Sequence, residues 1–398
     1  MRLTRLQLED FRSYASAELH PEPGLTIVAG PNGAGKTNLL EAIFVAVTGR
    51  SHRAGSDAEL VRHGSPFSRI RLDLADPLGA ATARVELVLP ADDAPPELRK
   101  RVTVNGLARR PSTIGETVRV VLFRPEEMLL LVGAPTERRR FLDAILAQRH
   151  RAAARDLAEL GRILAQRNAL LRAIRREEAT PDNLAFWDEQ LAQVGARVMA
   201  LRLQLVADLA TRIPALHDSV APPAERGEQV RLAYADTLNE AWPERPGPEE
   251  AASSAGQGPP HEELAEAYRR RIRQVREKEL WNGVSLVGPH RDDLRVELGG
   301  REVASHASRG QQRTIILALK LAETDLLGAD DAPTPIVLLD DVFSELDADR
   351  SERSLALLLE RGQVLVTMAD LASLPAGRRG VTIWQVGEGR LSQAPRVA

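Results

Sequence analysis

The stretch that decides the fold is Gly30-Pro31-Asn32-Gly33-Ala34-Gly35-Lys36-Thr37. It matches the phosphate-loop pattern G-x-x-x-x-G-K-[ST] and lies between a short apolar run at 25–29 and a predicted helix from residue 38. The glycines let backbone N–H groups turn toward a phosphate at the positive end of the helix dipole. Lys36 is expected to contact the β- and γ-phosphates of ATP, and Thr37 is expected to bind Mg²⁺.

A second stretch supplies the carboxylates that such a loop requires. It reads Ile336-Val-Leu-Leu-Asp340-Asp341, and its four apolar residues predict a buried parallel strand. Carboxylates at the end of such a strand lie where α/β folds bind their ligands. Asp340 is expected to hold Mg²⁺ through water, and Asp341 to polarise the attacking water. Together with Lys36, these two are the predicted catalytic residues.

The composition excludes several classes of protein. A chain of 398 residues should hold two or three domains, and 43% hydrophobic with 27% charged residues is typical of a globular protein. With no cysteine, disulfides, zinc-thiolate sites and thiol catalysis are excluded. A net charge of −3 indicates no overall basic field for nucleic acid. Without a secretory start or an apolar run of about 18 residues, we expect a cytoplasmic protein with no membrane partner.

The chain divides into three segments of different character. Residues 1–135 are rich in predicted strands, 136–280 are mostly helical, and in 281–398 strands and helices alternate. The predicted fold is therefore α/β, with a mixed sheet around the phosphate loop and a helical second lobe. Within that lobe, residues 217–260 are rich in Pro, Gly, Ala and Ser and are predicted to be a linker.

A helical hairpin is predicted inside the second lobe. Heptad-spaced apolar positions run over 157–174, with Arg167 as one polar interruption, and start again over 184–205. Thr180-Pro-Asp-Asn183 between them reads as a turn with a helix cap. The pattern predicts a short antiparallel coiled coil, with a helix over 141–174 of about 50 Å.

Further motifs resemble those of ABC-type ATPases. Ser308-Arg-Gly-Gln311 precedes the strand that ends at Asp340, and Ser344-Glu-Leu-Asp347 follows it. The two are similar to the signature motif and the D-loop of that class, which implies an ABC-type ATPase head. The resemblance also implies that a partner subunit's ATP is contacted by four residues, Ser308, Gly310, Gln311 and Asp347.

Motifs spread from about residue 2 to 370 resemble the RecF family of bacterial recombination mediators. They are Asp10-Phe-Arg-Ser-Tyr14, 30–41, Gly49-Arg-Ser-His-Arg53, Phe123-Arg-Pro-Glu-Glu127, Gly133-Ala-Pro135, Arg138-Arg-Arg-Phe-Leu-Asp143, Gly288-Pro-His-Arg-Asp-Asp293 and 339–347. The resemblance implies an ATP- and Mg²⁺-dependent homodimer on gapped or junction DNA, with double- and single-stranded parts. It also implies cooperation with RecR and RecO in loading RecA, and a contact of Arg12 with ATP.

Three departures from the ABC pattern argue against fast hydrolysis. Asp341 replaces the usual glutamate, Thr367 stands where the switch histidine is expected, and no glutamine lies between residues 7 and 148 to serve as the Q-loop residue. Glu126 or Glu127 is the candidate substitute for that glutamine. We therefore expect a weak, DNA-dependent ATPase that acts as a switch.

Clustered arginines are the candidates for DNA contact. They are Arg138 and Arg139, followed by Arg140, and Arg269, Arg270 and Arg273, followed by Arg276. Arginine contacts to phosphates would give salt-dependent binding with little sequence preference. The alternatives are a solvated helix face among nearby glutamates and, for 138–140, contacts within the chain. His290 and Arg291 have no derivable role, and His290 lacks partner ligands for a metal.

Two other classes of ATPase carry a similar head. An SMC-like chromosome-organising ATPase would need long coiled-coil arms and a hinge, which a hairpin of about 50 Å does not provide. The energising subunit of a transporter would carry its signature motif much nearer the loop, whereas 272 residues separate Lys36 from Ser308.

Overall fold

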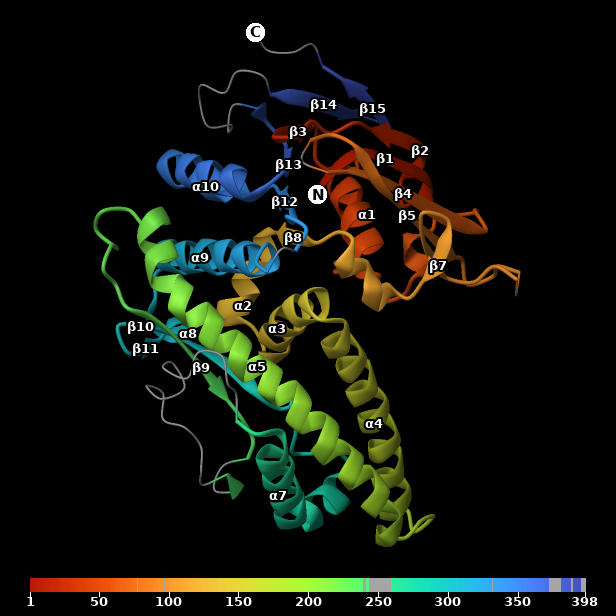
Figure 1. Ribbon diagram of the computed structural model, residues 1–398, viewed down its shortest axis with the longest axis vertical. Helices are drawn as coiled ribbons and strands as arrows, with labels where there is room; N and C mark the ends of the chain where they lie inside the picture. Colours follow the sequence, from red (N-terminus) through yellow and green to blue (C-terminus); the bar gives the residue numbers. More distant parts are fainter. Residues whose placement is uncertain are drawn as a thin grey trace. The chain divides into compact units, whose positions relative to one another are not determined.

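The computed structural model describes residues 1–398 except 77, 96, 239–240, 243–258, 331, 372–380, 388 and 395–398. These residues form two compact units (Figure 1). The first unit contains Met1–Glu127, Ser219–Ala224 and Leu317–Ala398, and the second contains Met128–Asp218 and Glu225–Ile316. The predicted segment 281–398 differs from this division, because its first strands pair with a strand of the helical unit.

A mixed sheet forms the centre of the first unit. Its order is β15-β14-β3-β13-β12-β8. The strands are β3 (Leu25–Ala29), β8 (Val120–Phe123), β12 (Ile336–Asp340), β13 (Val364–Met368), β14 (Thr382–Gly387) and β15 (Arg390–Gln393). All neighbours are parallel except β14 and β15, so the predicted mixed sheet is confirmed. Only β13 separates β3 from β12, which places the carboxyl ends of both strands at one edge.

A second, antiparallel sheet covers helix α1 (Lys36–Thr48). Its order is β2-β1-β4-β5-β6-β7. The strands are β1 (Arg2–Phe11), β2 (Tyr14–Leu19), β4 (Phe67–Ala75), β5 (Ala81–Pro90), β6 (Arg101–Val104) and β7 (Leu107–Arg109). Leu6 of β1, Ile43 of α1 and Leu338 of β12 belong to one buried core. Since α1 is buried by both sheets, its sequence is apolar on most faces.

Shorter elements complete the first unit. They are η1 (Ala58–Leu60), η2 (Pro111–Glu116), η3 (Pro125–Met128), η6 (Val342–Glu345) and α10 (Ala348–Arg361). Helix α9 (Arg309–Leu327) begins in the second unit and ends in the first.

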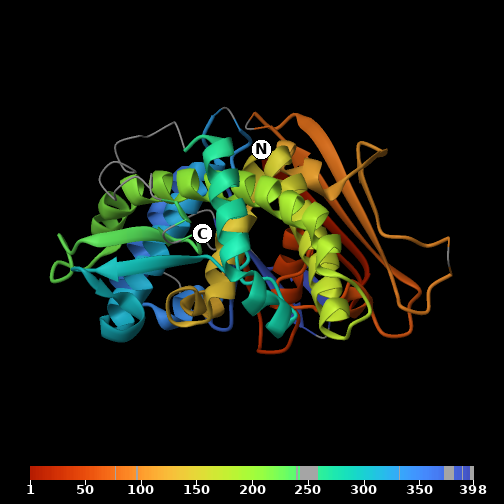
Figure 2. The same ribbon diagram turned by 90° about the horizontal axis from the view of Figure 1, so that it is seen from below.

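The second unit is built on the predicted hairpin. Helix α4 (Arg151–Arg175) and helix α5 (Leu184–Val220) are joined by η4 (Pro181–Asn183), where Thr180 and Asn183 form a capping box. Two ion pairs between α4 and α5, Asp156–Arg197 and Arg167–Asp188, show that the helices are antiparallel. The remaining elements are α2 (Leu129–Val132), α3 (Pro135–Arg149), α7 (His261–Asn282), α8 (Val303–His306), β9 (Val230–Ala235), β10 (Asp293–Leu298) and β11 (Arg301–Glu302). Figure 2 shows β9 and β10 side by side, as their antiparallel register requires.

Two boundaries of the second unit differ from the predictions. The predicted helix over 141–174 is interrupted at His150, whose backbone is extended (φ −134°, ψ 115°). Helix α4 alone, with 25 residues, is about 37 Å long. The predicted linker over 217–260 begins inside α5 and includes strand β9, while residues 239–240 and 243–258 lie outside the described residues.

Arg167, the polar interruption of the heptad register, is fully buried. Its guanidinium donates to Glu279 Oε2 of α7 (2.5 Å), to Asp188 Oδ1 of α5 (2.9 Å) and to Ser285 Oγ (2.7 Å). Glu279 is also fully buried, and its Oε1 accepts a hydrogen bond from the backbone N–H of Leu286 (2.8 Å). A buried charge needs such partners, so these bonds fix three helices in one register.

Among the described residues, no helix has the length and apolar character to cross a membrane.

Replacing Glu279 with alanine should destabilise the helical unit by about 3–5 kcal/mol, because the buried Arg167 charge loses its fully buried carboxylate partner and keeps only the more exposed Asp188. The matched control is Glu178→Ala, which removes the exposed Arg176–Glu178 pair and should cost no more than about 1 kcal/mol. Hydrogen exchange of the α4 and α7 amides measures both effects. Equal protection in the two variants would show that the buried pair does not stabilise the unit.

Candidate phosphate-binding site

The predicted phosphate loop connects β3 to α1 and requires glycine at its ends. A Cβ on Gly30 would lie 2.4 Å from the carbonyl oxygen of Val386. Gly35 has φ +109°, and the Tyr14 hydroxyl donates to its carbonyl oxygen (3.0 Å). The loop backbone is therefore held curled at the N-terminus of a helix of 13 residues, where the helix dipole favours an anion.

Lys36 lies inside this loop. Its Nζ donates to the carbonyl oxygens of Gly30 (2.8 Å) and Pro31 (3.0 Å), and the residue is only 7% exposed. Asn32 and Gly33 are exposed at the tip of the loop. An ammonium group has three N–H donors, so these two bonds leave one donor for a phosphate oxygen.

The two predicted Mg²⁺ residues are in contact. The Thr37 hydroxyl donates to Asp340 Oδ1 (2.9 Å), across 303 residues of sequence. The Thr367 hydroxyl donates to the same oxygen (2.6 Å), and Asp340 is 9% exposed. Mg²⁺ prefers oxygen ligands and binds through one or two protein groups together with phosphates and water. The hydroxyl and carboxylate at this position fit that requirement.

Asp341 is positioned by the same threonine. Its backbone N–H donates to Thr367 Oγ1 (3.0 Å), and its φ of +52° turns the chain away from β12 into η6. In the sequence, Thr367 stands out only as a replacement for a histidine. Sequence reasoning misses its role in orienting both aspartates, because no local pattern shows which strand lies next to β12.

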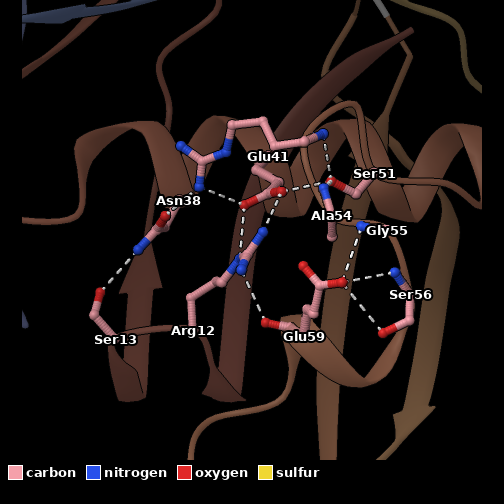
Figure 3. Close-up of polar contacts among 10 residues, drawn as sticks. Arg12, Ser13, Asn38, Glu41, Ser51, Ala54, Gly55, Ser56 and Glu59 are labelled. Atoms are coloured by element: carbon pink, nitrogen blue, oxygen red, sulfur yellow. Dashed lines mark hydrogen bonds and ion pairs between the residues drawn. The ribbon is translucent and has the colours of Figure 1, made fainter.

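Glu41 of α1 anchors a polar cluster beside the loop (Figure 3). Its carboxylate is fully buried and accepts hydrogen bonds from Arg12 Nε (3.1 Å) and Nη2 (3.0 Å). It also accepts from the Ser51 hydroxyl (2.6 Å) and from Arg53 Nη2 (2.9 Å). Burial alone would raise the pKa of Glu41, but the bonds from Arg12 and Ser51 and the charge of Arg53 hold the pKa below its ordinary value. The carboxylate is therefore ionised and holds two cations.

Arg12 and Arg53 each donate to one further acceptor besides Glu41, and Figure 3 labels Arg12 among the drawn residues. Arg12 Nη1 donates to the Glu59 carbonyl oxygen (2.9 Å), and Arg53 Nη2 donates to Asn38 Oδ1 (2.9 Å). Asn38 belongs to the first turn of α1, next to Thr37. The structure thus places Arg12, the predicted ATP contact, near the start of α1. It adds Glu41 and Arg53, which belong to the RecF-like motifs but have no role that the sequence alone assigns.

The predicted signature residues begin helix α9. Gln311 N–H donates to Ser308 Oγ (3.1 Å), and Ser308 N–H donates to Gln311 Oε1 (2.9 Å), which is a capping box. Ser308 is exposed and Gly310 is partly exposed. The signature lies in the second unit and the phosphate loop in the first. Asp347, the predicted D-loop contact, caps α10 by accepting from Arg350 N–H (2.9 Å).

The two candidate substitutes for the Q-loop glutamine differ in environment. Glu127 accepts from Arg124 Nε (3.3 Å) and lies 3.4 Å from Nζ of the buried Lys320. The Glu126 side chain is 59% exposed, with an Arg124 nitrogen 4.0 Å away. Glu127 is therefore held in a structural cluster, and Glu126 is the more accessible carboxylate.

Four of the five arginines predicted to bind DNA make polar contacts within the chain. Arg138 forms a two-pronged pair with Asp293 (2.7 and 2.9 Å), and Arg139 donates to the Asp292 carbonyl oxygen (2.9 Å). Arg269 pairs with three glutamates, at 189, 262 and 266. Arg273 pairs with Glu266 (3.3 Å), and Arg270 is partly buried.

The loop of residues 288–293 is largely buried in the helical unit, while Arg291 is exposed. Burial lowers the pKa of His290 to about 4, and its Nε2 lies 3.1 Å from the Ser285 carbonyl oxygen. Arg202 donates to the Pro289 carbonyl oxygen (2.6 Å). Within the described part of the chain, no group of three or more His, Asp or Glu residues could hold a metal ion.

Comparison with known proteins agrees with this geometry. The profile of the RecF/RecN/SMC N terminal domain matches residues 2–389. The DNA replication and repair protein RecF of Herpetosiphon aurantiacus is 37% identical over 386 residues, which cover 93% of this chain and 94% of that protein.

Solved structures extend the comparison. The recombination mediator protein RecF-ATPrS in the RecFOR pathway superposes with a TM-score of 0.85 at 25% identity, and covers 99% of this chain and 98% of that one. An SMC head bound to the C-winged helix domain of ScpA, at 14% identity and a TM-score of 0.53, covers 99% of this chain and 97% of that one and shows the common fold. The ABC-type head predicted from the sequence is therefore confirmed. The chain belongs to the RecF family of DNA replication and repair proteins.

Proposed function

We propose that this protein is an ATP-switched dimer that binds gapped or junction DNA in recombinational repair. The observation that carries the proposal is the Thr37–Asp340 contact of 2.9 Å beside the Lys36 ammonium group. It unites a phosphate loop and a carboxylate from opposite ends of the chain, which is what an ATP–Mg²⁺ complex requires. Solved relatives described as RecF-ATP and RecF-ATPrS support ATP as the nucleotide.

Each residue of the site has a distinct proposed role. The loop N–H groups and Lys36 bind the β- and γ-phosphates, while Thr37 and Asp340 would hold Mg²⁺, which neutralises phosphate charge. Asp341 orients the attacking water, and Arg12 supplies positive charge beside α1. Because Asp341 is one methylene shorter than the usual glutamate, we expect slow hydrolysis that serves to reset the dimer.

The signature motif is proposed to act on the ATP of a second copy. Ser308 and Gly310 lie at the exposed N-terminus of α9, whose dipole favours an anion. Gln311 and Asp347 of the partner are proposed to contact the same ATP. The second copy would then complete the binding site for the ATP held by the first copy. ATP binding therefore drives dimerisation.

The proposed partners come from the family. A solved relative is a recombination mediator of the RecFOR pathway, which supports RecR and RecO as partners. We propose that the DNA-bound dimer works with them to load RecA. Helix α4, at about 37 Å, is even shorter than predicted and gives no support to the alternative of an SMC-like chromosome organiser.

Replacing Ser308 with arginine should abolish ATP-dependent dimerisation while the monomer still binds ATP. The bulky cation would occupy the position that the partner's γ-phosphate is proposed to reach. The matched control is Ser305→Arg, three residues earlier and also exposed, which should dimerise normally. Light scattering with and without ATP and Mg²⁺ measures the mass. A dimer of the Ser308 variant would contradict the two-chain site.

Replacing Glu41 with alanine should weaken ATP binding about 10- to 100-fold, equivalent to about 1.4–2.7 kcal/mol, because Arg12 and Arg53 lose the carboxylate that positions them. Glu59→Ala is the control. The Glu59 carboxylate accepts from Gly55 and Ser56 backbone N–H groups and not from either arginine. Titration with a fluorescent ATP analogue measures both affinities. Equal affinities would show that the arginines do not depend on Glu41.

A further inference from the structure

The outward face of α4 carries a continuous line of exposed residues. Counting along the helix in alternating steps of four and three gives arginine at 151, 155, 162, 172 and 176 and alanine at 158, 165 and 169. All eight are exposed, whereas Leu160, Ile163 and Arg167 on the other face are buried. We call this line the α4 basic stripe. It contains five cations and no acidic residue.

The charges of the stripe are largely unneutralised. Among the described residues, Arg151, Arg155, Arg162 and Arg172 form no ion pair, while Arg176 pairs with Glu178 (2.9 Å). The two acidic residues of α4, Asp156 and Glu159, both pair with Arg197 of α5. The acidic groups are thus held at the hairpin interface, and the outward face stays positive.

We propose that the α4 basic stripe binds the sugar–phosphate backbone of duplex DNA. This inference rests on the proposed function and names a DNA-contacting surface for it. One guanidinium group can bind two oxygens of a phosphate at the same time. The small alanines between the arginines let a DNA backbone approach the helix closely. From Arg151 to Arg172, 21 residues rise about 32 Å, close to one turn of B-DNA at about 34 Å.

Other occupants fit the stripe less well. Single-stranded DNA is usually held by aromatic stacking, and the stripe has no aromatic residue. A membrane-surface helix needs an exposed apolar face, whereas the apolar face of α4 is buried in the hairpin core. The arginines at 138, 139, 269 and 273 make polar contacts within the chain. Because the chain as a whole has a net charge of −3, it has no overall positive field that would attract a polyanion. A local surface of unneutralised arginines is therefore where polyanion binding is favoured.

The test removes four charges from the stripe and compares the result with four charges removed elsewhere. The stripe variant is Arg151→Gln, Arg155→Gln, Arg162→Gln and Arg172→Gln. The control variant changes the exposed Arg109, Arg110, Arg295 and Arg301 to glutamine. Fluorescence anisotropy with a labelled duplex and a gapped duplex is measured with ATP and Mg²⁺ over a KCl series. Circular dichroism, monomer mass and ATP affinity must match wild type in both variants.

The stripe variant should bind at least about tenfold more weakly at moderate salt. Its slope of log K against log salt should be shallower by about three to four, because each phosphate that is no longer neutralised reduces the slope by about 0.9. The control should differ from wild type by less than about twofold. A gain-of-charge variant, Ala158→Arg with Ala165→Arg and Ala169→Arg, should bind more tightly and with a steeper slope.

Two results would overturn the inference. In the first, wild type binds duplex DNA and the stripe variant keeps the same affinity and salt slope. That result would contradict the stripe as the DNA-contacting surface but would leave the proposed function standing. The other is displacement of the duplex by an equal charge of polyglutamate, which would show that the stripe takes acidic polymers in general. If wild type itself binds neither duplex at any salt concentration, the proposed function fails instead.

Discussion

The hydrogen bond from the Thr37 hydroxyl to the Asp340 carboxylate is the interaction on which the site depends. A carboxylate that is 9% exposed must have hydrogen-bond partners, and both of those described come from other elements, α1 and β13. That contact exists only because β3, β13 and β12 are parallel neighbours in this order. Sheet topology therefore determines whether Thr37 and Asp340 meet at all.

A second buried carboxylate, that of Glu41, fixes the positions of two arginines in the site. Glu41 has no exposed surface, and it holds Arg12 and Arg53 in fixed positions before any ligand arrives. Positive groups that are already oriented need no rearrangement when a charged ligand binds, which makes their interaction with it stronger. The site thus combines a loop that is held curled with two buried carboxylates, Asp340 beside Thr37 and Glu41 between Arg12 and Arg53.

Local signals explain which features could be predicted. The phosphate loop, the strand ending at Asp340 and the turn at 180–183 each carry a pattern within a few residues. The break at His150 has no glycine or proline to mark it. Thr367 and the partners of Arg167 come from elements distant in sequence, so no local pattern could have identified them.

Charge runs proved a poor guide to accessible charge. Arg269 lies in a dense basic run, but it forms a two-pronged pair with Glu189 of another helix, 80 residues away. The α4 basic stripe is spread over 26 residues, from Arg151 to the C-cap residue Arg176, and is visible only when the buried face of the helix is known. Counting at helical spacing opposite the apolar register, rather than counting adjacent arginines, would have found it in the sequence.

The most direct test of the central claim is sedimentation velocity of the unaltered protein with a gapped duplex, with and without ATP and Mg²⁺. The account predicts two protein copies on each DNA when ATP is present, and free monomers when it is absent at moderate salt. Sedimentation that gives the same protein-to-DNA ratio with and without ATP would contradict an ATP-switched dimer on DNA.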